Sequence, residues 1–369
     1  MRKRLLLIGL PMFCLLLTAC TGGRMLIYNF SDIKDYKRFP ARELPAAATP
    51  FRFAERDAAF IQGKDIRISH KNRHEHLDSL LLGSNTVAFL IIQHDTILYE
   101  RYFRKYDRES LVASFSMAKS YTSALVGCAL ADGLIKSVED KMVDYLPELQ
   151  GKGLEDVKIR HLLQMTSGIH HEENYYNPFA GVARLYYGKH LHRQIRHIGK
   201  DMPAGHYFKY KSINTQLLGE IVARVTGKSL TQYMNEKIWS QIGTEYPATW
   251  SIDQKKDGME KAFSSINATA RDFAKFGRLY LHNGNWNGKQ LISKEWVEES
   301  TKVDAQDGSV TYYQYQWWLP TKTGDFMANG HLGQYIYVNP AKDLIVVRLG
   351  KNEGKVSWWQ AFTEIAAQL

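Results

Sequence analysis

A run of small residues, 118–131, is the feature that most constrains this chain, and it follows a serine and a lysine spaced three apart, Ser116 and Lys119. The run ends at Asp132 and Gly133, and a glycine there is typical of a helix C-terminus. The pattern therefore predicts a core helix that begins directly after Ser116. Residues three apart on a helix share a face, so we expect Lys119 beside Ser116.

A serine and a lysine at this spacing can form an activated nucleophile. A serine hydroxyl needs a base beside it, and a lysine serves when burial or neighbouring cations lower its pKa. The N–H groups and positive dipole end of a helix N-terminus also suit a developing oxyanion. The alternative is an N-cap serine with a solvated lysine. A second Ser-x-x-Lys, from Ser31 to Lys34, lies in a polar segment with no helical run after it, so the motif alone does not decide.

The first residues have the pattern of a bacterial lipoprotein signal, which we assign to residues 1–19. The basic residues 2–4 precede the apolar stretch 5–17, which is too short to span a membrane as a mature helix. Residues 17–20 match a lipobox, so we expect cleavage before Cys20 and lipid attachment to it. A plain signal peptide or an uncleaved anchor is the alternative. We expect a lipid-anchored envelope protein, on the outer membrane facing the periplasm if the cell has two membranes.

Cysteine usage and charge narrow the class of protein. Cys14 would leave with the signal and Cys20 would be acylated, so only Cys128 remains and no internal disulfide is expected. The net charge of +10 includes three basic residues of the signal. A moderately basic envelope protein favours anionic surfaces or substrates. No strip of basic and aromatic residues indicates nucleic acid as a partner.

The mature chain divides into a linker and one domain. Residues 20–50 are polar and contain several prolines, which is typical of a tether between lipid and domain. We assign residues 51–369 to a single domain of the α+β class. Strands at both ends of this domain enclose a helical lobe at about 140–265. Hairpins give an antiparallel sheet, which must join the N-terminal hairpin to the C-terminal strands. A site is expected between the sheet part and the lobe.

The hydrophobic patterns place these elements along the chain. Residues 86–93 and 96–103 predict a β-hairpin just before the Ser116 helix. Further elements are helices at 214–227, 230–242, 268–281 and 358–369, and strands at 313–319, 326–330, 333–338 and 344–349. Strand alternation puts one of Trp317 and Trp318 inside.

Two further stretches fit the Ser-Lys hypothesis. In Tyr210-Lys211-Ser212, a tyrosine near a lysine ammonium can have its pKa lowered and shuttle protons, and Ser212 can extend the hydrogen-bond relay. The alternative is a core tyrosine before an N-cap. In His331-Leu332-Gly333-Gln334, Gly333 would let a substrate come close and the Gln334 N–H would be the second oxyanion donor. The alternative is a turn glycine and a surface histidine.

With these three motifs in this order, the chain resembles the serine β-lactamase-like superfamily over about residues 50–369. The resemblance is closest to the class C β-lactamase branch, which also holds penicillin-binding-protein-like D-alanyl-D-alanine peptidases, esterases and 6-aminohexanoate-dimer hydrolases. The supporting stretches are 159–163, 165–168, 266–269, 276–277 and 333–338.

The resemblance implies roles for particular residues. It implies a Ser116 nucleophile, Lys119 and Tyr210 as the acid/base pair, and an oxyanion hole from the N–H groups of Ser116 and Gln334. In the hydrolase and esterase members, a tyrosine of the helical lobe and an asparagine before a later helix touch the substrate. The matching positions are Tyr175 or Tyr176, and Asn267.

The sequence departs from the lactamase pattern in three places. The second motif ends in Ser212 rather than asparagine, and His331-Leu332 stands where lactamases carry Lys-Thr, which helps bind the drug carboxylate. No Glu-x-x-Leu-Asn stretch is present, so the deacylating glutamate of class A enzymes has no counterpart. We therefore do not expect efficient β-lactam hydrolysis. The Tyr-x-Ser form is most similar to the 6-aminohexanoate-dimer hydrolases and esterases.

These observations favour an envelope serine hydrolase that cleaves an ester or small amide through an acyl-enzyme on Ser116. The alternatives are a D-amino-acid peptidase or transacylase acting on peptidoglycan, and a catalytically weak binding or scaffold lipoprotein. No cofactor is expected. No metal is expected either, because the histidines are scattered and His-Glu-x-x-His does not occur.

Overall fold

The computed structural model describes residues 23–24, 28, 30–55 and 66–369 of the 369-residue chain. The expected signal segment, Cys14 and the lipobox Cys20 lie outside the described residues. Within the described part, no helix is both long and apolar enough to cross a membrane.

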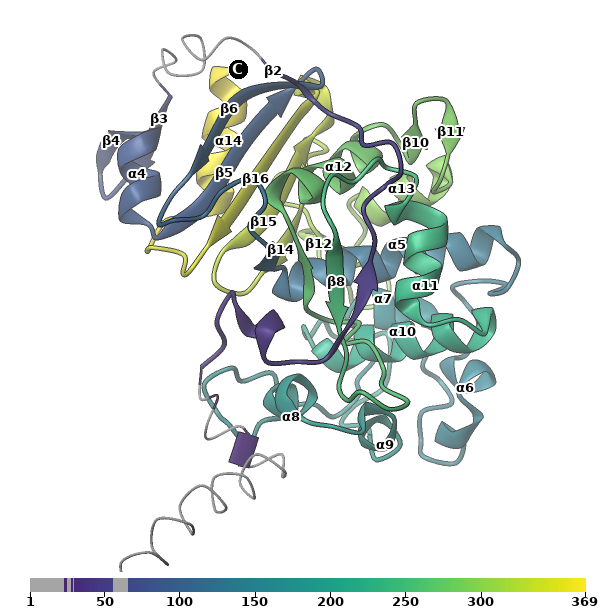
Figure 1. The fold of residues 1–369 in the computed structure, drawn as a ribbon. Coiled ribbons are helices and arrows are strands. Elements are labelled where there is room, and N and C mark those ends of the chain that lie inside the picture. Colours follow the sequence, from purple (N-terminus) through teal and green to yellow (C-terminus); the bar gives the residue numbers. More distant parts are fainter. Residues whose placement is uncertain (1–22, 25–27, 29, 56–65) are drawn as a thin grey trace, which may run out of the picture.

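An eight-stranded sheet joins the two ends of the domain, as the sequence predicts (Figure 1). Its strand order is β12-β13-β14-β15-β16-β5-β6-β2, and β5 and β6 form the predicted antiparallel hairpin. Strand β16 pairs antiparallel with β5, with Val347 opposite Leu90. The bounds are β2 Ala54–Glu55, β5 Thr86–Gln93, β6 Thr96–Tyr102, β12 Tyr313–Gln314, β13 Trp317–Trp318, β14 Phe326–Gly330, β15 Gln334–Asn339 and β16 Leu344–Gly350.

One predicted strand, 313–319, is wrong. The structure has a tight hairpin there, because Tyr315 and Gln316 adopt positive φ angles between β12 and β13. The sequence carries no glycine or asparagine to signal this turn. Tertiary hydrogen bonds hold it instead: the Gln316 amide donates to the Leu162 and Leu163 carbonyls. Trp317 is nonetheless buried and Trp318 partly exposed, as strand alternation predicts.

Helices cover both faces of this sheet (Figure 1). On one face, α12 (Ala270–Leu281) packs on β15 and β16, and Gly277 gives the close approach, since a Cβ there would lie 2.9 Å from Ile336. On the other face lie α4 (Leu77–Gly83) and α14 (Trp358–Gln368), in an aromatic and aliphatic cluster that includes Phe89 and Phe362. The core is therefore divided between two layers.

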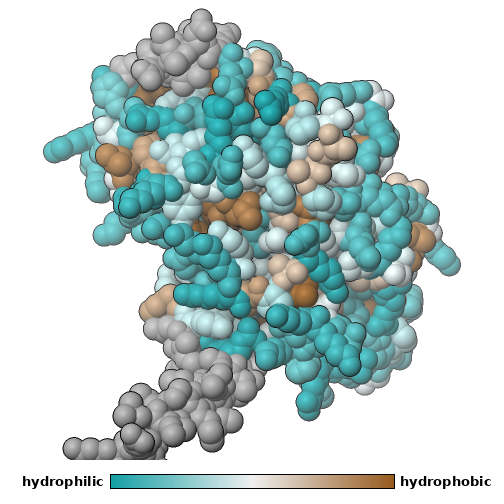
Figure 2. Space-filling view, in the orientation of Figure 1, coloured by the Kyte–Doolittle hydropathy of each residue, from teal (hydrophilic) through white to brown (hydrophobic). Residues whose placement is uncertain are grey.

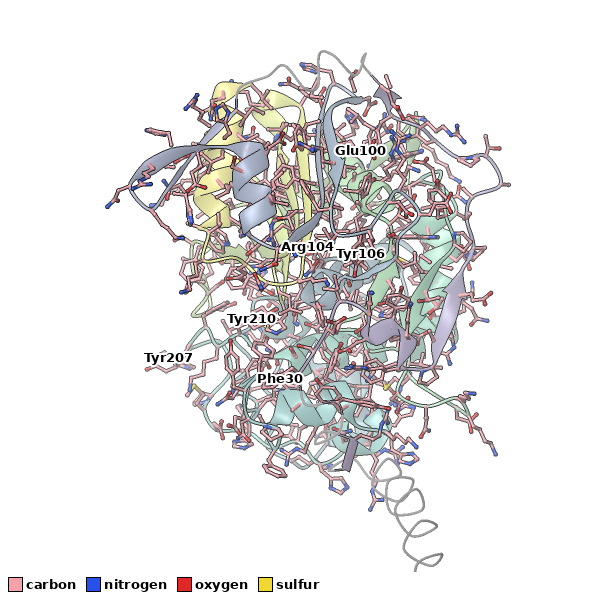
Figure 3. The ribbon with its side chains drawn as sticks, turned by 60° about the vertical axis from the view of Figure 1, so that its left-hand side comes forward. Phe30, Glu100, Arg104, Tyr106, Tyr207 and Tyr210 are labelled. Carbon is pink, nitrogen blue, oxygen red and sulfur yellow. The ribbon has the colours of Figure 1, made fainter. Side chains whose placement is uncertain are left out.

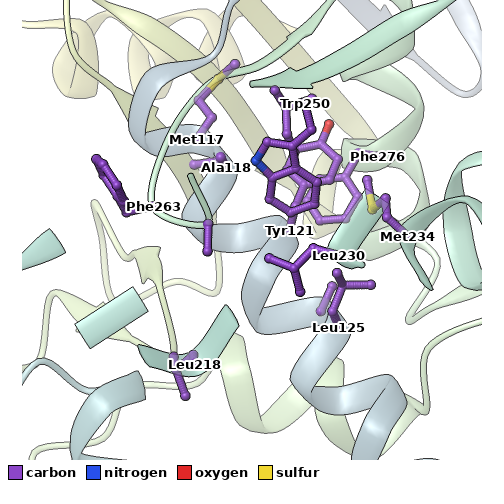
Figure 4. Close-up of a cluster of buried hydrophobic side chains, with 14 of the residues drawn as sticks. Met117, Ala118, Tyr121, Leu125, Leu218, Leu230, Met234, Trp250, Phe263 and Phe276 are labelled. Atoms are coloured by element: carbon purple, nitrogen blue, oxygen red, sulfur yellow. The ribbon is translucent and has the colours of Figure 1, made fainter. Parts of the chain in front are cut away.

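The predicted small-residue helix, α5 (Ala118–Ala131), runs through the larger core. Every residue from Ala118 to Ala129 is buried. Tyr121 stacks on Phe276 with ring centroids 3.6 Å apart, and the close-up in Figure 4 shows both beside Trp250. Gly127 is needed for packing, because a Cβ would meet the Trp296 ring at 2.5 Å.

The middle of the chain forms the predicted helical lobe. Helix α10 ends at Gly227 in the left-handed conformation that glycine favours. The predicted helix 230–242 is α11 followed by a π-helical turn, η4. The bounds are α6 Met142–Tyr145, η3 Pro147–Leu149, α7 Ile159–Leu163, α8 Gly181–Tyr187, α9 Leu191–Ile195, α10 Ser212–Thr226, α11 Leu230–Met234 and η4 Asn235–Trp239.

A four-stranded sheet, β1-β8-β9-β7, links the lobe to the segment that carries Ser116. Its bounds are β1 Ala41–Leu44, β7 Val112–Ala113, β8 Ala248–Ser251 and β9 Ile266–Ala268. Because β1 belongs to this sheet and Phe39 is buried, the expected linker 20–50 is wrong for its described C-terminal part. The purple chain in Figure 1 runs along β8. Tertiary packing by a few apolar residues outweighs the polar, proline-containing composition.

The remaining elements are two short hairpins, one helix and three short turns. They are the hairpins β3 Arg67–His70 with β4 Arg73–His76 and β10 Asn285–Trp286 with β11 Lys289–Gln290, helix α13 Lys294–Thr301, and the short turns η1 Asp35–Lys37, η2 Phe115–Met117 and η5 Pro340–Lys342. The face shown in Figure 2 is mostly hydrophilic, and its apolar spots are small and separate.

Candidate active site

Ser116 lies at the junction between β7 and α5. The turn η2 carries it, and Phe115 just before it has a φ of +45°, which is strained for a bulky residue. The Ser114 N–H donates to the Ile266 carbonyl, which fixes the segment to β9. Strand β14 approaches closely from the other side, because a Cβ on Gly330 would lie 2.2 Å from the Ser114 oxygen. The serine is therefore held between two sheets.

The structure brings Lys119 and Ser116 together. Lys119 Nζ lies 2.9 Å from Ser116 Oγ and 3.1 Å from both Ser212 Oγ and the Phe263 carbonyl oxygen. The side chain is buried, and burial lowers the pKa of Lys119 to about 8, while the charge of Glu173 opposes that shift. A large share of Lys119 is therefore a neutral amine at mildly alkaline pH, which a general base requires.

Tyr210 is the second group beside the serine. Its ring lies 4.9 Å from Lys119 Nζ and stacks on Trp318 at 5.5 Å. Burial raises the pKa of Tyr210, and a hydrogen bond with Ser116 only partly opposes this rise. This differs from the lowered phenol pKa that the sequence suggests, because desolvation of the phenolate outweighs the nearby lysine. Tyr210 is thus a proton donor at neutral pH.

Glu173 completes the group, and sequence reasoning missed it. Its carboxylate accepts hydrogen bonds from the Ser212 N–H at 2.8 Å and the Ser212 hydroxyl at 2.5 Å. The Tyr175 hydroxyl also donates to it at 2.8 Å, and His171 Nε2 lies 3.4 Å away. Since the Ser212 proton points to Glu173, the Ser212 oxygen accepts from Lys119. The sequence shows Glu173 only in a His-Glu-Glu run, and no local signal links it to residue 212.

A cavity opens beside Ser116 between the sheet part and the lobe, where the sequence places the site. His331 and Tyr175 stack on each other at its wall, with ring centroids 5.2 Å apart. Burial lowers the pKa of His331, which favours the neutral ring. The lining residues are Ser31, Phe115, Ser116, Tyr175, Val182, Ala183, Tyr186, Tyr187, Ser212, Phe263, Ser264 and His331. Among these described residues there is no aspartate, glutamate, lysine or arginine.

Tyr175 and Tyr176 differ in position. Tyr175 lines the cavity, whereas Tyr176 is 83 % exposed and does not line it. Asn267, the expected substrate contact, is not a lining residue either. It is buried in β9, where its amide donates to Thr249 Oγ1 at 3.0 Å and Ser251 Oγ at 3.2 Å. Its role as a substrate contact therefore stays a prediction.

Hydrogen bonds to other parts of the protein fix the turn from His331 to Gln334. The Gln334 side chain is buried and binds the Gly350 backbone through both its amide nitrogen and its oxygen. Gly333 has a φ of +81°, and its carbonyl accepts from the buried Arg348 guanidinium at 2.6 Å. A Cβ at residue 333 would lie 2.1 Å from Arg348 Nη1, so packing alone already requires this glycine. The Gln334 N–H as an oxyanion donor stays a prediction.

No group of three or more histidine, cysteine, aspartate or glutamate side chains that could hold a metal ion occurs in the described part of the chain. The arrangement offers a hydroxyl nucleophile, an amine of lowered pKa, a phenol of raised pKa and an uncharged cavity. These are the parts needed for acyl transfer from an ester or amide.

Comparisons with known proteins agree with this chemistry. The beta-lactamase family model matches residues 81–358. The 6-aminohexanoate-dimer hydrolase of Paenarthrobacter ureafaciens is 28% identical over 335 residues, covering 83% of this chain and 82% of that protein. A solved Bacillus anthracis structure, a candidate 6-aminohexanoate-dimer hydrolase, has a TM-score of 0.80 at 25% identity, covering 91% of this chain and 92% of that one. A family VIII carboxylesterase has a TM-score of 0.61 at 17% identity, covering 79% and 95% of the two chains.

Proposed function

This chain belongs to the beta-lactamase family, and on that premise we propose that it is an envelope serine hydrolase that cleaves an ester or small amide through an acyl-enzyme on Ser116. Its α+β fold and its membership of a serine hydrolase superfamily with esterase and amide hydrolase relatives are established by the comparisons. The observation that carries the proposal is the 2.9 Å approach of a buried Lys119 to Ser116.

In the first half-reaction, neutral Lys119 accepts the Ser116 proton while Ser116 Oγ forms a bond to the substrate carbonyl carbon. The carbonyl π pair moves to oxygen, and the backbone N–H groups of Ser116 and Gln334 are the expected donors to that oxyanion. When the tetrahedral intermediate collapses, the bond to the leaving alkoxide or amine breaks. The phenol of Tyr210 protonates the leaving group and regains a proton from the Lys119 ammonium.

In the second half-reaction, water replaces the leaving group. The amine of Lys119 removes a water proton as the water oxygen attacks the acyl carbon, and the acid is released as Ser116 regains its proton. Glu173 holds Ser212, and Ser212 in turn holds Lys119 Nζ toward the nucleophile. Glu173 is therefore a positioning residue.

The lining of the cavity supports an uncharged acyl group. A β-lactam and a peptide ending in D-alanine both present a carboxylate, and a carboxylate favours a cationic partner in a desolvated site. The described lining offers none, since burial favours neutral His331. We therefore place an ester or small amide before the peptidoglycan and β-lactam alternatives. The envelope location rests on the lipobox at Cys20.

The test is labelling with an alkyl fluorophosphonate, which phosphonylates an activated serine and releases fluoride. Full-length protein in detergent would be followed by intact-protein mass spectrometry beside Ser116→Ala and the remote control Ser69→Ala on β3. We expect one adduct on the wild type and on Ser69→Ala, and none on a folded Ser116→Ala. An adduct that persists in Ser116→Ala, or its absence from folded wild type, would overturn the assignment.

A further inference from the structure

The N-terminal strap, defined as residues 30–44, forms part of the cavity that holds Ser116. Ser31 lines this cavity together with Tyr186 and Tyr187 of α8. Figure 3 shows Phe30, at the start of the strap, near the teal helices of the lobe and on the same side as Tyr210. Ser31, the serine of the second Ser-x-x-Lys motif, thus lines the cavity that holds Ser116.

A buried carboxylate fixes the strap to the cavity wall. Asp35 is buried, and it accepts a hydrogen bond from the Tyr186 hydroxyl at 2.9 Å. It also pairs with Arg38 at 2.7 Å, inside the strap. A buried carboxylate without partners would be costly, so these bonds favour a single position of the strap against α8.

Aromatic contacts hold the next turn of the strap. Phe39 packs edge-on against Tyr186 with ring centroids 5.2 Å apart and lies 6.4 Å from Tyr187. On its other side, the buried Lys261 Nζ lies 4.0 Å from the Phe39 ring centroid. Burial lowers the pKa of Lys261 to about 7, so this is a cation–π contact mainly below that pH and a packing contact above it. The strap therefore packs as core and not as a mobile arm.

Backbone bonds connect the strap with the nucleophile segment. The Ala113 N–H, three residues before Ser116, donates to the Ile33 carbonyl at 3.0 Å. Further along, β1 pairs with β8, and Ala41 lies opposite Ser251. Because β8, β9 and β7 follow in one sheet, the strap and Ser116 share one hydrogen-bonded frame.

We propose that the N-terminal strap is a fixed wall of the acyl pocket and that Ser31 limits the length of the acyl chain that the enzyme accepts. This inference rests on the proposed function, since it assumes acylation of Ser116. Serine is small and polar, whereas Val182 and Ala183, which line the same cavity, are apolar. A larger side chain at residue 31 would occupy space that the acyl chain needs.

The experiment compares two fluorophosphonates that differ only in alkyl length, ethyl and octyl, on full-length protein in detergent. The alkyl group stays on Ser116 after fluoride leaves, so it stands for the acyl chain. Ser31→Trp should lower the ratio of octyl to ethyl labelling rates by about tenfold, the order expected when a hydrophobic pocket loses room. Ser31→Gly should raise this ratio. The control Lys37→Trp places the same side chain at an exposed strap position and should leave the ratio unchanged.

The outcomes separate the two proposals. If Ser116 is labelled but the ratio is the same in Ser31→Trp, Ser31→Gly and wild type, the strap inference is wrong and the serine hydrolase assignment stands. If neither probe labels the folded wild type, the proposed function itself fails. Thermal melting identifies a Ser31→Trp protein that does not fold, and Ser31→Gly then carries the test alone.

Discussion

Two opposing effects on one amine set the working pH of this site. Burial lowers the pKa of Lys119, and the Glu173 carboxylate raises it, leaving a value of about 8. A lysine of ordinary pKa would be almost fully protonated at pH 8 and useless as a base. Without the Glu173 carboxylate, the Ser212 hydroxyl would lose the partner that fixes its orientation, and Lys119 would then be held less firmly by Ser212.

The first prediction is the pH dependence of wild-type hydrolysis. The neutral form of Lys119 is active and its pKa is depressed, so kcat/KM for a short p-nitrophenyl ester should rise with pH and level off above about 8. Tyr210 adds no falling limb below pH 9, because its pKa is raised above that of an ordinary tyrosine. A profile that falls between pH 8 and pH 9 would contradict these roles.

The second prediction concerns Glu173→Gln. Removing the charge takes away the interaction that raises the Lys119 pKa, so the rising limb should move to lower pH. The rate on the plateau should fall by at least about tenfold, since a neutral amide cannot accept both Ser212 bonds as well as a carboxylate does. The neighbouring Glu172→Gln, at an exposed position, is the control and should change neither. A lower rate with an unmoved limb would mean that the Glu173 charge does not raise the pKa of Lys119.

At the residue scale, local motifs predicted the groups that the structure brings together around Ser116 but not Glu173, which holds Ser212. Ser116, Lys119, Tyr210 and Ser212 stand in short patterns whose spacing or helix position has meaning on its own. Glu173 meets Ser212 across 39 residues, a contact with no local sequence signal. The hydrogen bonds of Asn267 have no local signal either, because its partners Thr249 and Ser251 lie on a neighbouring strand, and its substrate contact stays a prediction.

At the element scale, two sheets clamp the nucleophile turn, and the clamp depends on a close backbone approach. The end of β14 passes Ser114 so tightly that only glycine fits at residue 330. Long periodic elements such as β5, β14 and α5 were predictable from hydrophobic pattern and length. The β12–β13 hairpin was not, because buried bonds of Gln316 force a turn that its own residues disfavour.

The third prediction is therefore made for Gly330→Ala. The added methyl group would meet the Ser114 carbonyl at 2.2 Å, so β14 or the nucleophile turn must shift. A displacement near 1 Å can cost about a hundredfold in rate, and we expect a loss of that order in kcat/KM. Gly83→Ala in α4 is the matched control, since nothing lies within 4 Å of its added Cβ. Equal activity of the two variants would show that the β14 clamp does not matter.

At the scale of the whole molecule, the largest difference between the sequence prediction and the structure is the boundary between the linker and the domain. Composition made residues 20–50 resemble a tether throughout, whereas the strap is part of the domain from about residue 30. Its buried residues are few, Ile33, Asp35, Phe39 and Leu44, and they are too widely spaced to produce a periodic pattern. The average composition of a segment does not reveal a few widely spaced buried residues.

The fourth prediction tests the proposed lipid attachment and the location of the protein in the cell envelope. Expressed in a bacterium with two membranes and fed radiolabelled palmitate, the full chain should carry label and fractionate with the outer membrane. Cys20→Ser should abolish the label and release the protein from that fraction. Cys14→Ser, inside the expected signal, should behave as the wild type. Label that persists in Cys20→Ser would place the acyl group elsewhere.

The position of the strap limits the distance between the cavity and a lipid anchor at Cys20. The proposed lipid anchor at Cys20 is ten residues from Phe30, and a fully extended chain of that length spans at most about 35 Å. This limit is shorter than the width of the domain itself, which is about 40–50 Å for this chain length, and Tyr28 already packs against Phe39. With the proposed lipid anchor at Cys20, the pocket, with Ser31 in its wall, would lie in a thin layer above the lipid. Lengthening the chain before residue 30 would thicken that layer, whereas an insertion between Ser31 and Leu44 would disturb the pocket instead.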